Sequence, residues 1–173
     1  MVGFKKPTNK IVAAGRPLVQ ELKIETVTNL YPGRLVKKGT NDDDIVVNTA
    51  ANPPVGWLGY EQANPAFKPA SVDTIYGAAE DLVPVLNGGG FVVVGRLASG
   101  QSVVKGDPLV PVANGELAKG AALTITASGA ANITDGQAVT GSGYGSEGPI
   151  VGYAEETVDA SAAAKDIMVR SMI

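Results

Sequence analysis

The residues of this chain that could perform chemistry are almost all carboxylates. Histidine and cysteine are absent from its 173 residues, which removes Ser-His-Asp and Cys-His catalysis, Cys/His zinc sites, iron–sulfur clusters and disulfides. Carboxylates, lysines and tyrosines remain as acids or bases, and oxygen ligands remain for Ca²⁺ or Mg²⁺. A site must therefore be sought first among the acidic clusters.

The densest acidic cluster is Asp42-Asp43-Asp44. A Ca²⁺ loop needs carboxylates at alternate positions, a glycine at its sixth position and a distal bidentate Glu. Here the aspartates are consecutive, and the nearby glycine, Gly39, precedes them. We therefore predict a solvated turn and no metal site.

Other carboxylates could form the acid–base pair of a glycoside hydrolase. Carbohydrate enzymes also need aromatic platforms, but Trp57 is the one tryptophan and only 5% of the residues are aromatic. We predict that the chain is not an enzyme, has no catalytic residue and binds no cofactor. The carboxylates in question, interpreted as solubilising charge, are Glu61, Glu80, Asp81, Glu155 and Glu156.

A glycine run at 87–90 precedes an apolar segment and could suggest a phosphate-binding loop. No helical pattern follows it, and no Lys-Ser/Thr pair closes it, so the nucleotide-binding motif is incomplete. We interpret the run as a turn between two strands.

The elements that carry these residues are predicted to be short strands. The chain has 22 glycines, roughly twice the ordinary share of about 7%, and its apolar segments are four to seven residues long at a spacing of about ten, which is typical of a sandwich or barrel. Asn114-Gly115 predicts a two-residue hairpin with positive φ at both residues. Pro84 predicts a sheet edge or a bulge, and the alanine-rich residues 161–165 predict one helical turn. The expected strands are 22–27, 34–37, 44–48, 55–61, 81–86, 91–94, 101–104, 108–112, 123–126 and 166–173, with loops over 62–71 and around 141–145.

Two halves of the chain, about 18–90 and 91–173, share an order of elements. Residues 33–39 resemble 101–107 in type, 55–61 resemble 149–155 with Gly59-Tyr60 aligned to Gly152-Tyr153, and a strand beginning with Asp81 or Asp166 closes each half. Neither half has many bulky apolar residues, so we predict two similar β-units with a shared core.

Residues 1–17 are predicted to form an extended arm ahead of a β-domain at 18–173. Four basic residues and no acidic one lie in this segment, whereas the whole chain has a net charge of −3, so the remainder carries about −7. We expect the arm to meet an acidic partner surface. The candidate contact residues are Phe4, Lys5, Lys6, Lys10 and Arg16.

The charge and the hydropathy pattern exclude two classes of partner. A pI of about 4.9 argues against nucleic acid, because phosphate binding needs a basic surface. The longest strongly apolar segment, 91–94, is far shorter than the roughly 20 residues of a membrane helix. We expect neither a nucleic-acid partner nor a membrane.

The segments 100–120 and 149–173 resemble the small head-decoration, or cement, proteins of tailed bacteriophages. Three features carry the resemblance: Val-Val-Lys-Gly-Asp-Pro-Leu-Val followed by Asn-Gly, the strand Ile-Val-Gly-Tyr-Ala-Glu-Glu-Thr, and an alanine-rich pause before Ile-Met-Val-Arg. The extra length at 62–75 departs from that pattern.

The resemblance implies a virion structural protein that is made in the host cytoplasm and binds the outside of the assembled capsid. Its implied partner is the major capsid protein, and its implied oligomeric state is a homotrimer. The alternative is a non-catalytic β-domain that binds carbohydrate or belongs to a tail-fibre-like module. A hydrolase that uses carboxylates is a third, more distant reading.

Overall fold

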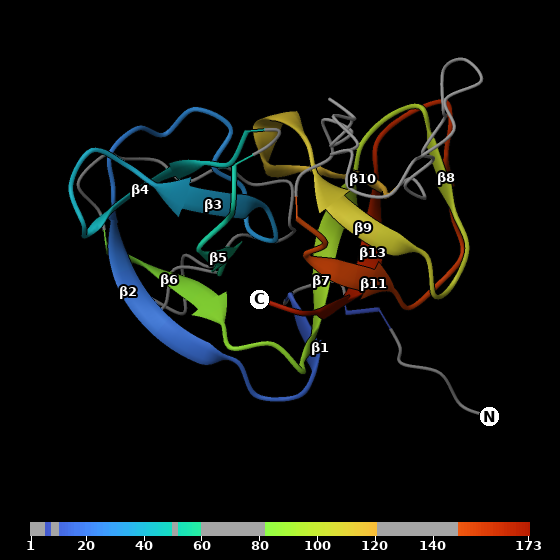
Figure 1. The fold of residues 1–173 in the computed structure, drawn as a ribbon, viewed down its shortest axis with the longest axis horizontal. Coiled ribbons are helices and arrows are strands. Elements are labelled where there is room, and N and C mark those ends of the chain that lie inside the picture. The colour runs from blue at the N-terminus through green and yellow to red at the C-terminus, as the bar shows by residue number, and fades with distance from the viewer. Residues whose placement is uncertain (1–5, 8–10, 50–51, 60–81, 121–148) are drawn as a thin grey trace, which may run out of the picture.

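The regular secondary structure of the residues that the structure describes is almost entirely strand. The computed structural model describes residues 6–7, 11–49, 52–59, 82–120 and 149–173. Within these ranges there is no α-helix, only one short 3-10 turn, η2 (Ala113–Gly115), and no helix long and apolar enough to span a membrane. The strands form two barrels, on the left and right of Figure 1, so the predicted all-β fold of two similar units is confirmed.

Five strands close the first barrel: β2 (Leu18–Ile24), β3 (Leu35–Lys38), β4 (Asp44–Val47), β5 (Gly56–Leu58) and β6 (Leu82–Asn87). Their order around the barrel is β2-β4-β3-β5-β6. β2 is antiparallel to β6 and parallel to β4, and the remaining neighbours are antiparallel. The barrel interior is an apolar core of Leu22, Ile24, Leu30, Val36, Ile45, Leu58, Val83 and Val85.

Five later strands close the second barrel: β7 (Val92–Leu97), β9 (Pro108–Pro111), β10 (Leu117–Lys119), β11 (Gly152–Ala154) and β13 (Lys165–Ser171). The order β7-β10-β9-β11-β13 returns to β7 through an antiparallel β7–β13 pairing. β1 (Val12–Ala14) adds to the edge of β7. A separate two-stranded sheet consists of β8 (Gln101–Val103) and β12 (Val158–Ala160).

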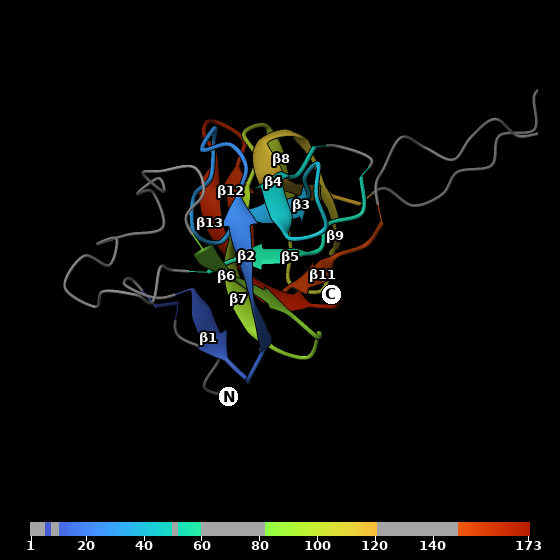
Figure 2. The same ribbon diagram turned by 90° about the vertical axis from the view of Figure 1, so that its left-hand side faces the viewer.

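The two barrels have the same strand topology. In each barrel the first strand is antiparallel to the last and parallel to the third, and the other neighbours are antiparallel. Figure 2 views the pair with the first barrel nearer the reader. The strands β2, β3, β4, β5 and β6 therefore correspond to β7, β9, β10, β11 and β13.

A glycine in the fourth strand of each barrel shows which residues of the two barrels are equivalent. A Cβ built on Gly56 would lie 2.6 Å from the Leu86 carbonyl oxygen, and one built on Gly152 would lie 2.6 Å from the Arg170 carbonyl oxygen. Only a residue without a Cβ lets the two strands approach so closely. Gly56 thus corresponds to Gly152, Leu86 corresponds to Arg170, and the next residues, Trp57 and Tyr153, also correspond.

The same register continues in the other strands. Ile24 pairs with Ile45 in the parallel contact of the first barrel, and Leu97 pairs with Leu117 in that of the second. Residues 18–24 therefore correspond to residues 91–97. Likewise Leu35 and Pro108 correspond, since they lie opposite Trp57 and Tyr153.

The barrels share an apolar core through side chains that point out of the first barrel. Leu35, Trp57 and Leu86 belong to the cluster that fills the second barrel. Trp57 is fully buried, and its indole N–H donates to Ser171 Oγ at 3.0 Å, which satisfies the one polar atom of the ring. A Cβ at Gly95 would lie 2.9 Å from its Cζ3. Trp57 is therefore a wedge between the two barrels, as the predicted shared core requires.

Most predicted strands are present, with shifted ends. β2 begins at Leu18, four residues earlier than predicted, because it pairs with β6 from Leu18 opposite Asn87 onward. The predicted hairpin and its positive φ values are confirmed, since Asn114 and Gly115 have φ of 59° and 65° and lie between two antiparallel strands, β9 and β10. The predicted two-residue loop is wrong, because the last paired residues are Pro111 and Leu117 and a 3-10 turn spans Ala113–Gly115.

The prediction that Pro84 marks a sheet edge or a bulge is wrong. β6 lies between β2 and β5 in a continuous register, with Pro84 opposite Glu21. The Pro84 carbonyl accepts the Gly59 N–H at 2.7 Å, one residue beyond the end of β5. The proline nitrogen faces Gly59 on the same side as this carbonyl, so the proline removes only the last bond at the end of the β5–β6 ladder.

The prediction of a helical turn at 161–165 is also wrong. The chain bends after β12, and the Ser161 N–H donates to Asp159 Oδ1 at 3.0 Å. This contact closes a turn through the aspartate side chain, and β13 begins at Lys165.

The predicted echo between the halves exists, but its alignments are wrong. β3 corresponds to β9, whereas residues 33–39 were expected to match 101–107, which include β8. Gly56, not Gly59, corresponds to Gly152, and Leu82, not Asp81, corresponds to Asp166. Glycines recur at both candidate positions, and residue identity alone does not show which of them faces a neighbouring backbone.

Several predictions concern residues outside the described ranges. They are the loop over 62–71, the strand at 123–126 and the loop around 141–145, together with Glu61, Glu80 and Asp81.

Candidate functional site

Five residues were predicted to contact a partner surface, and the structure describes two of them. Phe4, Lys5 and Lys10 lie outside the described residues, whereas Lys6 and Arg16 lie within them. Arg16 is exposed and has no polar partner within the described part of the chain. Its guanidinium is therefore available to a partner, while Lys6 has a different environment.

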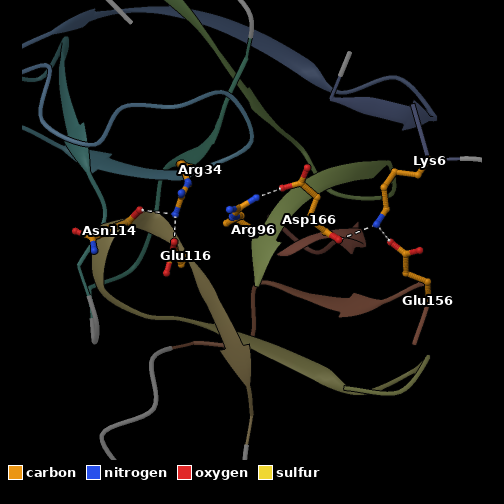
Figure 3. A network of polar contacts seen from close by, with 7 residues as sticks. All are labelled: Lys6, Arg34, Arg96, Asn114, Glu116, Glu156 and Asp166. Carbon is orange, nitrogen blue, oxygen red and sulfur yellow. Dashed lines mark hydrogen bonds and ion pairs between the residues drawn. The ribbon is translucent and has the colours of Figure 1, made fainter. Parts of the chain in front are cut away.

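Lys6 is held by the second barrel (Figure 3). Its Nζ lies 2.7 Å from Glu156 Oε1 and donates to the Asp166 carbonyl oxygen at 2.7 Å. Glu156 Oε1 also accepts the Met168 N–H at 2.8 Å, and Asp166 Oδ1 lies 2.8 Å from Arg96 Nη1. Ion pairs of this partly exposed kind are individually worth about 0–1 kcal/mol, so Lys6 is held by several weak contacts and not by one strong one.

Residues 11–14 of the predicted arm are part of the second barrel. Ile11 is 3% exposed, and its carbonyl accepts the Val94 N–H at 2.7 Å. Ala13 and Ala14 pack on the outer side of β7 and β13. The segment that was predicted to reach a partner therefore covers an edge of its own barrel at 11–14.

Arg34 joins the first barrel to the second at the tip of the β9–β10 hairpin (Figure 3). Its Nη1 donates to Glu116 Oε1 and, at 3.4 Å, to the Asn114 carbonyl oxygen. Asn29 Nδ2 donates to Asn114 Oδ1 at 2.9 Å, and the Arg34 guanidinium lies 5.3 Å from the centre of the Tyr31 ring. The hairpin tip thus binds the first barrel through one half-buried charge and several neutral contacts.

Most of the described acidic residues are paired with bases or with hydrogen-bond donors; Glu21 and Asp43, which are exposed, are exceptions. Glu155 lies 2.9 Å from Lys105 Nζ and 3.3 Å from Arg170 Nε. Asp44 is almost fully buried and accepts from Asn41 Nδ2 at 2.6 Å. Among the residues that the structure describes, no group of three or more potential metal ligands lies close enough together to hold a metal ion.

Three aspartates, Asp42, Asp44 and Asp107, have lowered pKa values. A hydrogen bond from Lys38 lowers the pKa of Asp42, and one from Asn41 lowers that of Asp44 against the opposing effect of burial. A hydrogen bond from Lys119, aided by the Val104 N–H, lowers the pKa of Asp107. Lowered values keep these carboxylates ionised, which suits structural anions and not proton donors.

The Trp57 wedge is the functional element that sequence reasoning missed. The signal for it was present: a lone tryptophan in a chain where only 5% of residues are aromatic. Nothing in the local pattern shows that this side chain points out of its own barrel, because a strand of three residues has too few positions to define an inner face.

The described charges are mostly paired, and the two barrels share an apolar core. Among known families, the model of the XM1 gp53 minor capsid protein matches residues 4–168. This chain belongs to that family, and it is a structural protein of a bacteriophage virion that associates with the capsid. The resemblance to capsid-associated proteins is therefore confirmed. No curated protein matches the chain.

Proposed function

We propose that this protein is a decoration, or cement, protein that binds the outer surface of the assembled phage head and stabilises it. The observation that carries the proposal is membership of a minor capsid protein family. A cement protein needs contact area repeated over a lattice and no chemistry, because many weak contacts add when both surfaces are multivalent. Two small barrels joined by a shared apolar core suit that role, and we propose that the chain is not an enzyme.

The proposed partner is the major capsid protein, and the proposed oligomeric state is a homotrimer on the shell, with the protein made in the host cytoplasm. Seven large apolar side chains of the described surface are exposed, and association would cover some of them. They are Leu18, Val19, Val55, Leu82, Val104, Ile150 and Met172.

The proposed contact residues remain Phe4, Lys5, Lys6, Lys10 and Arg16. Among the two that are described, the roles differ. Arg16 is free to pair with an acidic group of the shell, whereas Lys6 already pairs with Glu156. We propose that Lys6 positions the N-terminal segment and that Arg16 contacts the shell directly.

The test is reconstitution on heads that lack the protein. Purified protein is added to undecorated heads, which are then pelleted, and their disruption temperature is measured with and without it. We expect saturable binding, regular protrusions in electron micrographs and a higher disruption temperature. Absence of binding, or binding to the inner surface of opened shells alone, would contradict the proposal. Sedimentation of the free and the bound protein tests the trimer.

The carbohydrate-binding alternative has no observation in its favour. A sugar site commonly stacks its ligand on an exposed aromatic ring, and Trp57, the one tryptophan, is buried between the barrels.

A further inference from the structure

The two barrels differ at the outer edge of their first strands, β2 and β7, which are equivalent in the shared topology. In the second barrel, the outer edge of β7 is covered at residues 92–94 by β1, which runs antiparallel to it. The same edge of β7 meets β10 farther along, where the Ala98 N–H donates to the Leu117 carbonyl oxygen at 2.9 Å. β1 and β10 therefore lie end to end along one side of β7.

The equivalent edge of β2 is filled along only half of its length. The Lys23 and Glu25 N–H groups donate to Asp43 and Ile45 at 2.8 and 3.0 Å, so β4 occupies the position that β10 holds on β7. Backbone groups alternate sides along a strand, which directs those of Val19 and Glu21 to the same edge. No described strand covers them there.

Exposure follows the difference. Val92 and Val94, which pack with Ala13 and Ala14 of β1, are 5% and 1% exposed, and Val93, which belongs to the barrel core, is fully buried. The corresponding residues of β2 are Val19, which is 52% exposed, and Gln20 and Glu21, which are also exposed. Polar residues at two of the three positions keep this edge soluble while it is open, since an apolar open edge invites aggregation.

We propose that the edge of β2 at Val19–Glu21 binds an extended segment of the capsid shell protein as an added antiparallel strand. This inference rests on the proposed function and names its contact surface. β1 on β7 shows that the fold accepts a strand of this direction and length at this position, and strand addition to an open edge is a general mode of peptide recognition.

Charge favours the shell over a second copy of this chain. Arg16 and Glu21 flank the edge, are exposed, and have no polar partner among the described residues. A second β2 paired about a two-fold axis at Gln20 would set the two Glu21 side chains diagonally across the axis, about 7–8 Å apart, with like charges. A segment with an acid near Arg16 and a base near Glu21 avoids this repulsion, and an acid near Arg16 is also what the basic N-terminal segment was predicted to meet.

The test compares Val19→Pro with Val19→Thr in the full chain, using undecorated heads as the probe. Proline removes the N–H that points to the open edge and leaves the β6 ladder intact, whereas threonine retains it. We expect Val19→Pro to fold, to keep the oligomeric state of the parent protein and to bind heads about tenfold more weakly, the equivalent of one to two lost hydrogen bonds. Val19→Thr should bind like the parent.

Each other outcome has a defined meaning. Unchanged binding by a folded Val19→Pro protein overturns the inference while the proposed function stands. Loss of self-association with unchanged head binding overturns it in favour of a second copy at this edge. Failure of the parent protein to bind heads overturns the proposed function and this inference with it. Should Val19→Pro not fold, the Arg16→Glu/Glu21→Lys variant decides: weaker binding supports the inference, and unchanged binding overturns it.

Discussion

The outer faces of the two barrels, compared at equivalent positions, show why the chain packs as one pair. On the first barrel, Leu35, Trp57 and Leu86 are almost fully buried against the second. On the second barrel, the corresponding residues are Pro108, Tyr153 and Arg170; Arg170 is exposed, and its guanidinium lies 5.8 Å from the centre of the Tyr153 ring. The face that joins the barrels is thus apolar in one copy and polar in the other.

The position that makes room for the Trp57 ring also differs between the two barrels. Gly95 leaves room for the Trp57 ring in the second barrel, whereas Leu22, at the corresponding position, fills the interior of the first. A head-to-tail contact that repeats without closing builds filaments. The second barrel has Tyr153 in place of Trp57, and the first barrel has Leu22 in place of Gly95, so a third barrel cannot add in the same way. The open edge of β2 is a further difference between the two barrels.

The largest expected effect distinguishes the two equivalent aromatic residues. Trp57→Ala removes the wedge and should lower the free energy of unfolding by about 3–5 kcal/mol. Tyr153→Ala should cost about 1 kcal/mol or less, because it loses a partly exposed ring and a surface cation–π contact. Urea unfolding of both variants measures the difference, and equal costs would show that the barrels are not joined as described.

The receiving positions should respond to opposite changes. Leu22→Ala leaves a cavity in the first barrel and should cost about 2–5 kcal/mol. Gly95→Ala adds a carbon 2.9 Å from Trp57 Cζ3 and should cost about 1–3 kcal/mol through overpacking. In a Trp57→Ala background the cost of Gly95→Ala should fall, which a double-mutant cycle measures. Strict additivity would place the strain elsewhere.

The half-buried charge at the junction should matter more than an exposed pair of the first barrel. Arg34→Ala removes charge-assisted hydrogen bonds to the hairpin tip and leaves Glu116 without its base, at an expected cost of about 1.5–3 kcal/mol. Lys38→Ala breaks the exposed pair with Asp42 and should cost about 0.2–1 kcal/mol. Thermal unfolding at low and high salt compares the two, and the Lys38 effect alone should fade with salt. The reverse ranking would remove Arg34 from the junction.

The position equivalent to Arg34 holds an acid in the second barrel, and this acid should give a pH dependence. Lys119 and the Val104 N–H lower the pKa of Asp107 below 3.8. The folded state therefore holds the ionised form more strongly than the unfolded state does, so this stabilisation is present above pH 3.8 and is lost as pH falls through the lower folded value. Asp107→Asn should be less stable than the parent at pH 7, and the difference should shrink below pH 3.8.

Urea midpoints at pH 7 and at pH 3 provide the measurement. Asp43→Asn, at an exposed position of the Asp42–Asp44 turn, controls for the loss of a negative charge alone. A difference between Asp107→Asn and the parent that stays constant over this range would show that the Lys119 contact does not select the ionised form.

Local signals predicted the strands and turns, and long-range contacts decided what local signals could not. The hairpin at Asn114-Gly115 was predictable because positive φ at two successive residues restricts the residue types there. Pro84 misled because its cost depends on whether β5 extends opposite it, which the sequence around Pro84 does not encode. The alanine-rich residues 161–165 misled because the Asp159 carboxylate takes the Ser161 N–H.

The candidate contact residues show the same division. Clustered basic charge at the N-terminus was visible in the sequence, but the pairing of Lys6 with Glu156 depends on residues 150 positions apart. The open edge of β2 was not visible either, because it becomes apparent only when β1 is seen to cover the equivalent edge of β7. The duplication was detectable from the order of elements. Its residue-by-residue alignment required the close backbone contacts at Gly56 and Gly152.

Cryo-electron microscopy of the decorated phage head tests the central claim most directly. We predict two-barrel density on the outer surface of the shell, with β2 at the contact and a strand of the shell protein continuing the first barrel at Val19–Glu21. Density for this protein inside the shell, or outer density that contacts the shell only through the Tyr153–Arg170 face with β2 toward solvent, would contradict the account.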